Sequence, residues 1–297
     1  MSRHPLYGIF LAMAGALFLT PDAMFMRLSE MDGFQMVGWR GMLMGSVMLF
    51  GWAVLSRDRR GDLAQLGTGA AGAIIVCQLF NSILFSLGIA SAPAAAVLIG
   101  VAAVPVFSAL LSRVILAEPT QVATWVAMVA TIGGIAIAVS GGEDGEVTLN
   151  LRALLGAGFG LAVALVLALN FTILRARPGL PIMLVIGVGA WMAGLTGLTI
   201  TGADAMTEGR PWAIIVAGAV IMPVSFFTLS FASRHTQAAN VSLMMLLEVV
   251  LAPIWVWVGV GERPTVNMAI GGAVVVGSLA IYLVVTGRGL RPKQAHG

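Results

Sequence analysis

Long apolar runs without charged residues alternate with short polar links along the whole chain. A helix needs about 20 mostly apolar residues to cross the hydrocarbon core of a bilayer. The run over 63–112 is long enough for two such helices and is broken at Ser91-Ala92-Pro93, and two other runs are each interrupted by one charge, Arg40 or Glu248. The pattern predicts ten transmembrane helices, at 6–26, 34–55, 67–89, 93–115, 120–140, 153–174, 180–202, 211–232, 237–261 and 265–286.

Composition agrees with a membrane protein and excludes a soluble globular enzyme. Hydrophobic residues make up 59% of the chain and charged residues 10%, against about 45–50% and about 25% in soluble domains. No polar segment is long enough to form a separate soluble domain, so the function must reside among the helices. The expected fold class is an all-α integral membrane protein.

The sequence carries few of the groups that catalysis, metals or cofactors require. It has one cysteine, Cys77, and it contains no HExxH, no glycine-rich phosphate loop with lysine and no GxSxG motif. We therefore expect no enzyme activity, no metal, no cofactor and no nucleic-acid partner. The expected partners are the lipid bilayer, a small-molecule substrate and, as a further candidate, protons. Phosphorylated substrates are disfavoured because Arg40 is the single cation that the predicted spans place away from a span end.

Basic residues flank the predicted helices unevenly, and this asymmetry sets the expected orientation. With the amino terminus inside the cell, eleven basic residues lie on the cytoplasmic side and four on the other side. The first apolar run is closely followed by a second and lacks a small-residue cleavage site, so it is expected to be a retained helix. We expect a bacterial inner-membrane protein with both termini, Met1 and Gly297, in the cytoplasm.

The chain shows signs of an internal repeat. When it is shifted so that Glu118 falls on Glu262, the segment 94–97 (AAAV) falls on 238–241 (AANV), and both acids are followed by Pro-Thr. Two repeats of five helices, 1–145 and 146–297, would enter the membrane from opposite sides because five is odd. Secondary transporters are often built from such inverted repeats. The alternative is chance similarity between two alanine-rich apolar segments.

These residues resemble the EamA-type repeat of the drug/metabolite transporter superfamily. The pattern is an apolar helix with Glu or Glu-Pro near its middle, then Gly-Glu about fourteen residues later, and then a glycine-rich helix. Its residues are Pro105, Ala117-Glu118 and Gly133-Gly134 in the first half, and Glu248, Gly261-Glu262, Gly271, Gly272 and Gly277 in the second. The Glu-Pro pair is split between the halves. The resemblance runs from about Leu6 to Gly287, and it implies a ten-helix exporter of amino acids, drugs or other metabolites.

Apart from Arg113, which lies close to the end of its span, three charged residues lie within predicted spans, where each costs about 2.5–3.5 kcal/mol on insertion scales. Glu248 lies near the middle of its helix and could take up a proton, bind a substrate ammonium, or hold a neighbouring helix by a hydrogen bond. Asp22 and Arg40 lie near the outer ends of the first two helices. They are expected either to form a structural salt bridge or to act as a gate or substrate contact.

Uncharged polar residues also occur within the spans. Gln78, Asn81, Ser82 and Phe85 follow at helical spacings and share one face. As a set with polar residues of the second half they outline a central cavity, although each alone is more often a hydrogen bond between helices. The second-half candidates are Ser225, Thr228, Asn240 and Ser242, and the candidate hinges are Pro21, Pro105, Pro223 and Pro253.

The sequence thus predicts a secondary-active or facilitative transporter that exports a small uncharged or zwitterionic metabolite by alternating access. Amino acids are the first choice, because of the family resemblance and the neutral polar stripe. Efflux of lipophilic cations, with Glu248 as the counter-charge, is the alternative within transport. A membrane scaffold or an intramembrane enzyme is the alternative from another class.

Overall fold

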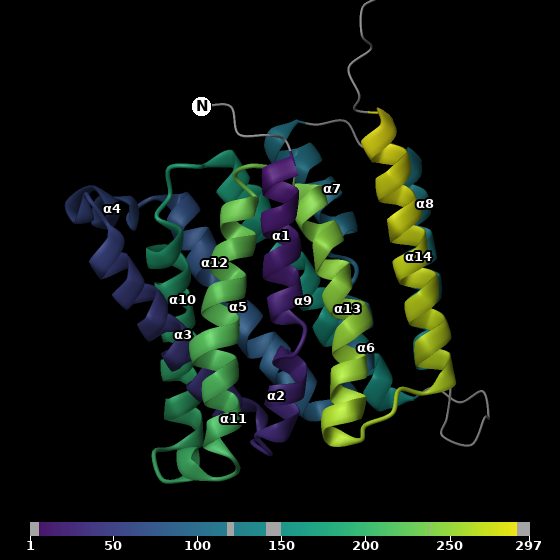
Figure 1. Ribbon diagram of the computed structural model, residues 1–297, viewed down its shortest axis with the longest axis horizontal. Coiled ribbons are helices and arrows are strands. Elements are labelled where there is room, and N and C mark those ends of the chain that lie inside the picture. Colours follow the sequence, from purple (N-terminus) through teal and green to yellow (C-terminus); the bar gives the residue numbers. More distant parts are fainter. Residues whose placement is uncertain (1–5, 118–121, 141–149, 237, 290–297) are drawn as a thin grey trace, which may run out of the picture.

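The computed structural model describes residues 6–117, 122–140, 150–236 and 238–289, and every regular element in these ranges is helical (Figure 1). The elements are α1 (Leu6–Leu19), α2 (Asp22–Leu28), α3 (Gly33–Leu55), α4 (Arg59–Gln65), α5 (Gly69–Ser91), α6 (Ala94–Val101), α7 (Val104–Leu116), α8 (Val122–Val139), α9 (Leu151–Ala176), α10 (Ile182–Thr201), η1 (Ala205–Thr207), α11 (Pro211–Ile215), η2 (Val216–Ile221), α12 (Met222–Ala232), α13 (Ala238–Val260) and α14 (Val266–Gly289).

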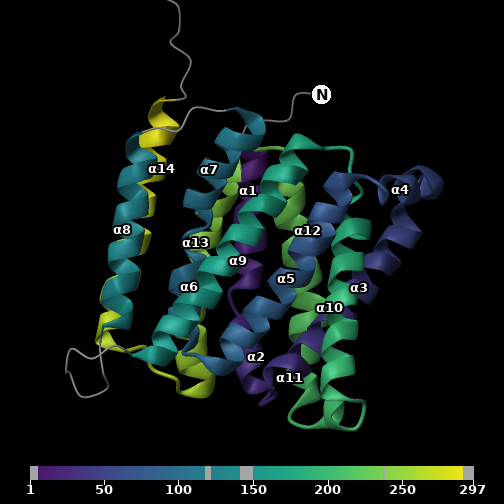
Figure 2. The ribbon, with the colours of Figure 1, turned by 180° about the vertical axis from the view of Figure 1, so that it is seen from behind.

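Each predicted span coincides with one helix or with a short series of helices. Eight spans are long and apolar enough to cross a membrane, and they include the composite spans Tyr7–Leu28, Ala94–Leu116 and Pro211–Ala232. The other two predicted spans are α8 and α14, which carry shorter apolar stretches among the described side chains. They lie side by side at one edge of the bundle (Figures 1 and 2). The expected multi-pass, all-helical fold is confirmed.

Three spans predicted as continuous helices are interrupted near their middles. The first breaks between α1 and α2 at Pro21, and another breaks between α6 and α7, just before Pro105. A third, over α11 to α12, contains the π-helical turn η2 directly before Pro223. Proline has no amide hydrogen to donate along a helix, so each break falls where a backbone hydrogen bond is missing. Pro253, by contrast, lies inside the continuous helix α13.

Glycines allow the most extensive helix pair, α3 with α10, to pack backbone against backbone. A Cβ atom added to Gly41 would overlap the backbone nitrogen of Gly194, and one added to Gly197 would overlap that of Gly38. Gly41 and Gly45, four residues apart in α3, therefore both lie at the interface with α10. Close packing of this kind supplies the dispersion contacts that hold helices together in lipid. Apolar side chains gain little free energy there by moving from the lipid tails into a helix interface.

Contacts that spans of the first half make with α9 have counterparts five spans later. Span α6–α7 packs on α9, as α13 packs on α1 and α2, and α5 packs on α9 as α12 packs on α1. The two most extensive pairs, α3 with α10 and α8 with α14, each join a span to its own counterpart. Two inverted copies would produce this pattern. The division at residues 145 and 146 stays a prediction, and Glu118, used to align the halves, lies outside the described residues.

We expect Gly194→Leu to destabilise the protein because its side chain would collide with α3. Overpacking costs about 1–3 kcal/mol or more, so thermal unfolding in detergent should begin at a lower temperature than in the unmodified protein. Gly158→Leu is the matched control, since Gly158 lies within α9 with nothing within 4 Å of an added Cβ. Equal unfolding temperatures for the two variants would contradict the close packing of α3 and α10.

Candidate functional site

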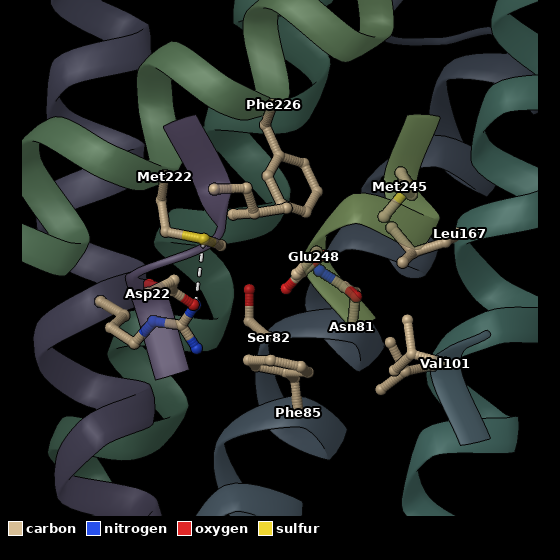
Figure 3. A pocket seen from close by; sticks show the side chains of 13 residues that line it. Asp22, Asn81, Ser82, Phe85, Val101, Leu167, Met222, Phe226, Met245 and Glu248 are labelled. Carbon is tan, nitrogen blue, oxygen red and sulfur yellow. Dashed lines mark hydrogen bonds and ion pairs between the residues drawn. The ribbon is translucent and has the colours of Figure 1, made fainter. Parts of the chain in front are cut away.

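A buried cavity lies at the level where the helices are interrupted (Figure 3). Its volume is about 20 Å³, close to the room that one water molecule needs, so the cavity is nearly closed in this conformation. Several lining residues come from the edges of the helix breaks. The cavity is lined by Leu19, Asp22, Arg40, Asn81, Ser82, Phe85, Val101, Val163, Leu167, Met222, Phe226, Met245 and Glu248.

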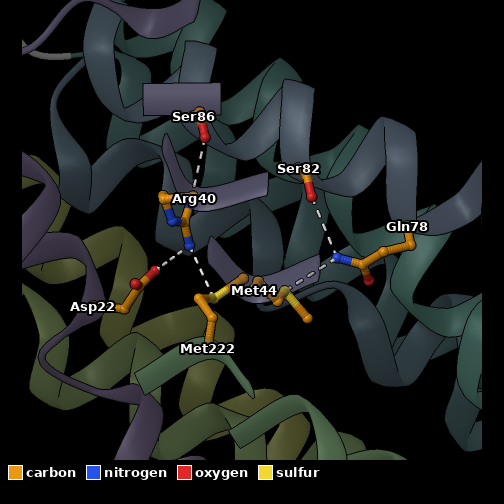
Figure 4. A network of polar contacts seen from close by, with 7 residues as sticks. All are labelled: Asp22, Arg40, Met44, Gln78, Ser82, Ser86 and Met222. Atoms are coloured by element: carbon orange, nitrogen blue, oxygen red, sulfur yellow. Dashed lines mark hydrogen bonds and ion pairs between the residues drawn. The ribbon is translucent and has the colours of Figure 1, made fainter. Parts of the chain in front are cut away.

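Asp22 and Arg40 form an ion pair at the edge of this cavity (Figure 4). Arg40 Nη2 lies 2.6 Å from Asp22 Oδ2, and the two side chains are only 3% and 2% exposed. Asp22 is the first residue of α2, where the helix dipole favours a negative charge. The break at Pro21 therefore creates a position for this carboxylate. The proposed gating or substrate role of the pair stays a prediction.

Further contacts hold the Arg40 guanidinium in place. Its Nη1 donates to Ser86 Oγ at 3.2 Å, and its Nη2 lies 3.0 Å from the sulfur of Met222. The guanidinium carbon lies 5.3 Å from the centre of the Phe85 ring, within range of a cation–π interaction. Arg40 Nε and Asp22 Oδ1 are buried and have no hydrogen-bond partner among the described residues. Each charge thus retains capacity for one more polar partner.

Glu248 lies in the same cavity as the ion pair but makes no hydrogen bond to any described residue. It comes from the interior of α13 and is 3% exposed. Figure 3 shows its carboxylate directed into the cavity, between Asn81 and Ser82. A buried carboxylate without a partner is costly. The geometry therefore leaves this group available for a proton or for a cation from the solute.

The polar stripe on α5 is divided between the cavity and a helix interface. Asn81, Ser82 and Phe85 line the cavity. Gln78, one turn away, does not line it. Its Nε2 donates to Ser82 Oγ at 3.3 Å and lies 3.7 Å from the sulfur of Met44 (Figure 4). Gln78 is thus linked to the cavity through Ser82.

The four polar candidates of the second half do not line the cavity. Thr228 donates to the Val224 carbonyl of its own helix at 2.6 Å, and Asn240 donates to Thr236 Oγ1 at 2.8 Å. Ser242 Oγ lies 3.1 Å from Ser108 Oγ and joins α13 to α7. Ser225 is buried, and its hydroxyl has no partner among the described residues.

Most of the cavity wall consists of apolar residues that the sequence did not single out. In Figure 3, Val101, Leu167 and Met245 lie opposite Asp22, and the Phe85 and Phe226 rings lie on the other two sides. Apolar residues face lipid, helix interfaces and cavities alike, so hydropathy alone does not distinguish them. In the sequence, the helix-breaking prolines were the one feature that indicated the position of these apolar cavity residues. The resulting cavity has a charged end and an apolar end.

Within the described ranges, no group of three or more His, Cys, Asp or Glu residues could hold a metal ion. The cavity instead combines one cation, two carboxylates, an amide and a hydroxyl with apolar walls. Such a set can bind and release a small amphipathic solute.

Comparison with known proteins identifies transporters to which this chain is similar. Residues 6–140 match the EamA-like transporter family. The chain is also similar to "Uncharacterized transporter YdfC" of Bacillus subtilis (strain 168), with 25% identity over 252 residues, 82% of this chain and 80% of that protein. These two matches support membership of the drug/metabolite transporter superfamily. One solved crystal structure has the same fold, with a TM-score of 0.68 and 16% identity, covering 96% of this chain and 98% of that chain.

The protein is a multi-pass membrane protein, and transport is its general function. The polar cavity residues come from both halves of the chain, but not symmetrically. The first half supplies Asp22, Arg40, Asn81 and Ser82, and the second half supplies Glu248. The position equivalent to Glu248 in the first half is Val104, which follows from the alignment of Glu118 with Glu262. Charge in the cavity is therefore unequally shared between the two halves.

The buried ion pair of this transporter should show strong coupling between its two members. Asp22→Asn and Arg40→Gln should each cost about 3–5 kcal/mol of stability, because each leaves a buried charge unpaired. The double variant should be less damaged than the sum of the single effects. Thermal unfolding of the purified variants measures this coupling.

The exposed pair of Glu30 and Arg210 provides a matched control. Its members lie 2.8 Å apart but are 58% and 51% exposed, so removing either should cost at most about 1 kcal/mol. Additive losses for Asp22 and Arg40, like those expected for this exposed pair, would contradict a tightly coupled buried pair.

Proposed function

We propose that this transporter exports small zwitterionic metabolites, with amino acids as the preferred class. The observation that carries the proposal is the joint presence of Arg40 and Glu248 in one buried cavity. An amino acid has a cationic ammonium and an anionic carboxylate a few bonds apart. The Glu248 carboxylate complements the ammonium, and the Arg40 guanidinium, which keeps a free Nε–H donor, complements the carboxylate.

The energetics of the cavity support a solute with both charges. A single charge moved into an apolar cavity loses its favourable free energy of hydration, and only a partner of opposite charge can offset that loss. A zwitterion brings no net charge, and each of its ends meets an opposite charge that already lies in the cavity. Asn81 and Ser82 lie beside Glu248 and can hydrogen-bond to the same solute groups. The apolar wall of Val101, Val163 and Leu167 suits an uncharged side chain.

Alternating access of two inverted repeats is the proposed mechanism of transport. The cavity lies between spans of both halves, and interrupted helices surround it. Broken helices at the membrane midplane are typical of binding sites in repeat-based transporters. The prolines at the breaks, Pro21, Pro105 and Pro223, are the proposed hinges. Pro253 is the remaining hinge candidate, although it lies inside a continuous helix.

The proposed location is the bacterial inner membrane, with export directed away from the cytoplasm. We call the side where α1 begins the Leu6 face. Basic residues of the described chain concentrate at the helix ends and links on this face, which favours its placement in the cytoplasm. They are Arg57, Arg59, Arg60, Arg113, Arg175, Arg177 and Arg234, against Arg27, Arg152, Arg210 and Arg263 at the opposite face.

Efflux of lipophilic cations is the second candidate, and the unpartnered Glu248 favours it. A large apolar cation could neutralise this carboxylate while its body contacts the cavity wall. Arg40 opposes such a ligand by charge repulsion, although its pairing with Asp22 reduces the effect. A zwitterion uses both charges, which is why it ranks first.

A flux panel in proteoliposomes tests the proposed substrate class. Labelled amino acids and labelled lipophilic cations are loaded separately, with and without a pH gradient. We expect amino-acid flux above that of protein-free vesicles. Cation flux without amino-acid flux would reverse the ranking, and the absence of flux for every solute would favour a scaffold. Dependence on the pH gradient would add the proton as a coupled ion.

Glu248→Gln tests the role of the central carboxylate. We expect flux to fall by roughly tenfold or more, because the amide cannot replace a charge-assisted hydrogen bond to the solute ammonium. Folding, measured by thermal unfolding, should be preserved, since Glu248 has no hydrogen bond to lose within the described chain. Glu208→Gln, at an exposed position in a link between helices, is the control and should leave flux unchanged. Unaltered flux of Glu248→Gln across pH would remove this residue from the mechanism.

A further inference from the structure

A second ion pair lies between the cavity and the face opposite the Leu6 face. Arg27, near the end of α2, pairs with Glu262 in the link between α13 and α14, with Nε and Oε2 2.9 Å apart. Arg27 Nη2 also donates to the Ala92 carbonyl at 2.6 Å, and Glu262 Oε1 accepts the amide of Ala94 at 2.8 Å. Two side chains thus join three separate segments of the chain.

The three joined segments belong to helices that line the cavity. Helix α2 begins with Asp22 and carries Arg27 toward its other end, and α6 begins with Ala94 and ends with Val101. Helix α13 contains Glu248 and ends just before Glu262. In Figures 1 and 2 the ends of α2 and α13 and the start of α6 lie at the same side of the bundle. The ion pair therefore fixes these three helices together on the side of the cavity away from the Leu6 face.

The other ends of α2 and α6 lie at helix breaks. Helix α2 is separated from α1 at residues 20–21, and α6 is separated from α7 at residues 102–103. Pro21 and Pro105 cannot donate a backbone hydrogen bond across these breaks. Each short helix can therefore pivot about its break while the longer neighbouring helix stays in place. Hinge positions of this kind absorb the backbone rotation in conformational changes.

We propose that Arg27 and Glu262 form the gate that closes the central cavity toward the face at which they lie. When the pair separates, the Ala92 and Ala94 contacts are lost with it, and α2 and α6 pivot away from α13. The cavity then opens to this face. The gate rests on the proposed central cavity, but not on which solute the cavity carries.

The exposure of the two ion pairs fits different roles. The side chains of Arg27 and Glu262 are 22% and 29% exposed, whereas those of Arg40 and Asp22 are 3% and 2% exposed. Separated charges at the gate can be hydrated by water from the adjoining face, which lowers the cost of opening. Separating Arg40 from Asp22 would leave two buried charges with neither a partner nor water, which is strongly destabilising. The gate pair is therefore the one suited to repeated opening.

Thiol labelling of a cavity residue tests the gate directly. The reporter is Ser82→Cys in a Cys77→Ser background, which removes the single native cysteine. A membrane-impermeant methanethiosulfonate reagent is applied to inside-out and to right-side-out vesicles, and the labelling rate is measured from each face. Arg27→Gln and Glu262→Gln are the gate variants. Glu30→Gln is the control, because it removes an exposed ion pair at the same face while the hydrogen bond from the Arg210 amide to the Ser29 carbonyl remains.

We expect both gate variants to raise the labelling rate from the face opposite the Leu6 face, here called the Glu262 side, by about tenfold. Loss of a charge-assisted contact shifts the equilibrium between the closed and the open gate by at least that factor. The rate from the Leu6 face should not rise, and Glu30→Gln should match the parent. Arg27→Lys, which keeps the cation, should stay closer to the parent than Arg27→Gln.

Three results would overturn the gate. An unchanged rate from the Glu262 side would show that the pair does not control access. A rise from both faces would show general loss of packing, as would a failure of Arg27→Lys to differ from Arg27→Gln. Because labelling needs no transported solute, the gate and the proposed substrate class can fail independently of each other.

Discussion

The structure depends on the need to keep charged groups satisfied in the middle of an apolar bundle. Arg40 and Asp22 are almost fully buried, and they are stable there because they contact each other, Ser86 and Phe85. Removing one partner of a buried ion pair is strongly destabilising, even though the intact pair adds little stability compared with well-packed apolar residues. Such a pair therefore determines which helices meet. Here it joins α2 to α3 beside the cavity. The break at Pro21 serves the same interaction, because it places Asp22 at the amino-terminal end of a helix.

Rigid and movable parts of the bundle differ in how their contacts are made. Glycine-mediated backbone packing holds α3 to α10 and α8 to α14, and such interfaces are bistable or rigid rather than continuously deformable. The short helices α2 and α6 are attached differently, through the partly exposed Arg27 and Glu262 and through breaks in the chain. The cavity lies between these two kinds of structure. This position, between a firmly packed frame and two short helices, suits the proposed alternating access.

The sequence predicted the membrane spans well because their signal is a sum over about 20 residues. It also identified Asp22, Arg40 and Glu248, since a charge inside an apolar run is unusual and costly. The apolar cavity wall, including Val101 and Leu167, could not be predicted, because hydropathy is the same for residues facing lipid, a neighbouring helix or a cavity. Nor could the polar residues be sorted: Asn81 lines the cavity, whereas Ser242 bonds to Ser108. Arg27 and Glu262 lie near span ends, where charges are common, so their pairing across the two halves had no sequence signal beyond the Gly261-Glu262 motif.

The central claim is that one cavity recognises both charges of a zwitterion, with Glu248 opposite the solute ammonium and Arg40 opposite its carboxylate. The most direct test measures binding of one transported amino acid to the purified protein, in competition with its decarboxylated amine and its deaminated acid. The account predicts that each analogue binds at least about tenfold more weakly than the parent, because each leaves one buried charge unpaired. An amine that binds as tightly as the amino acid would contradict it and would identify the cavity as a site for cations.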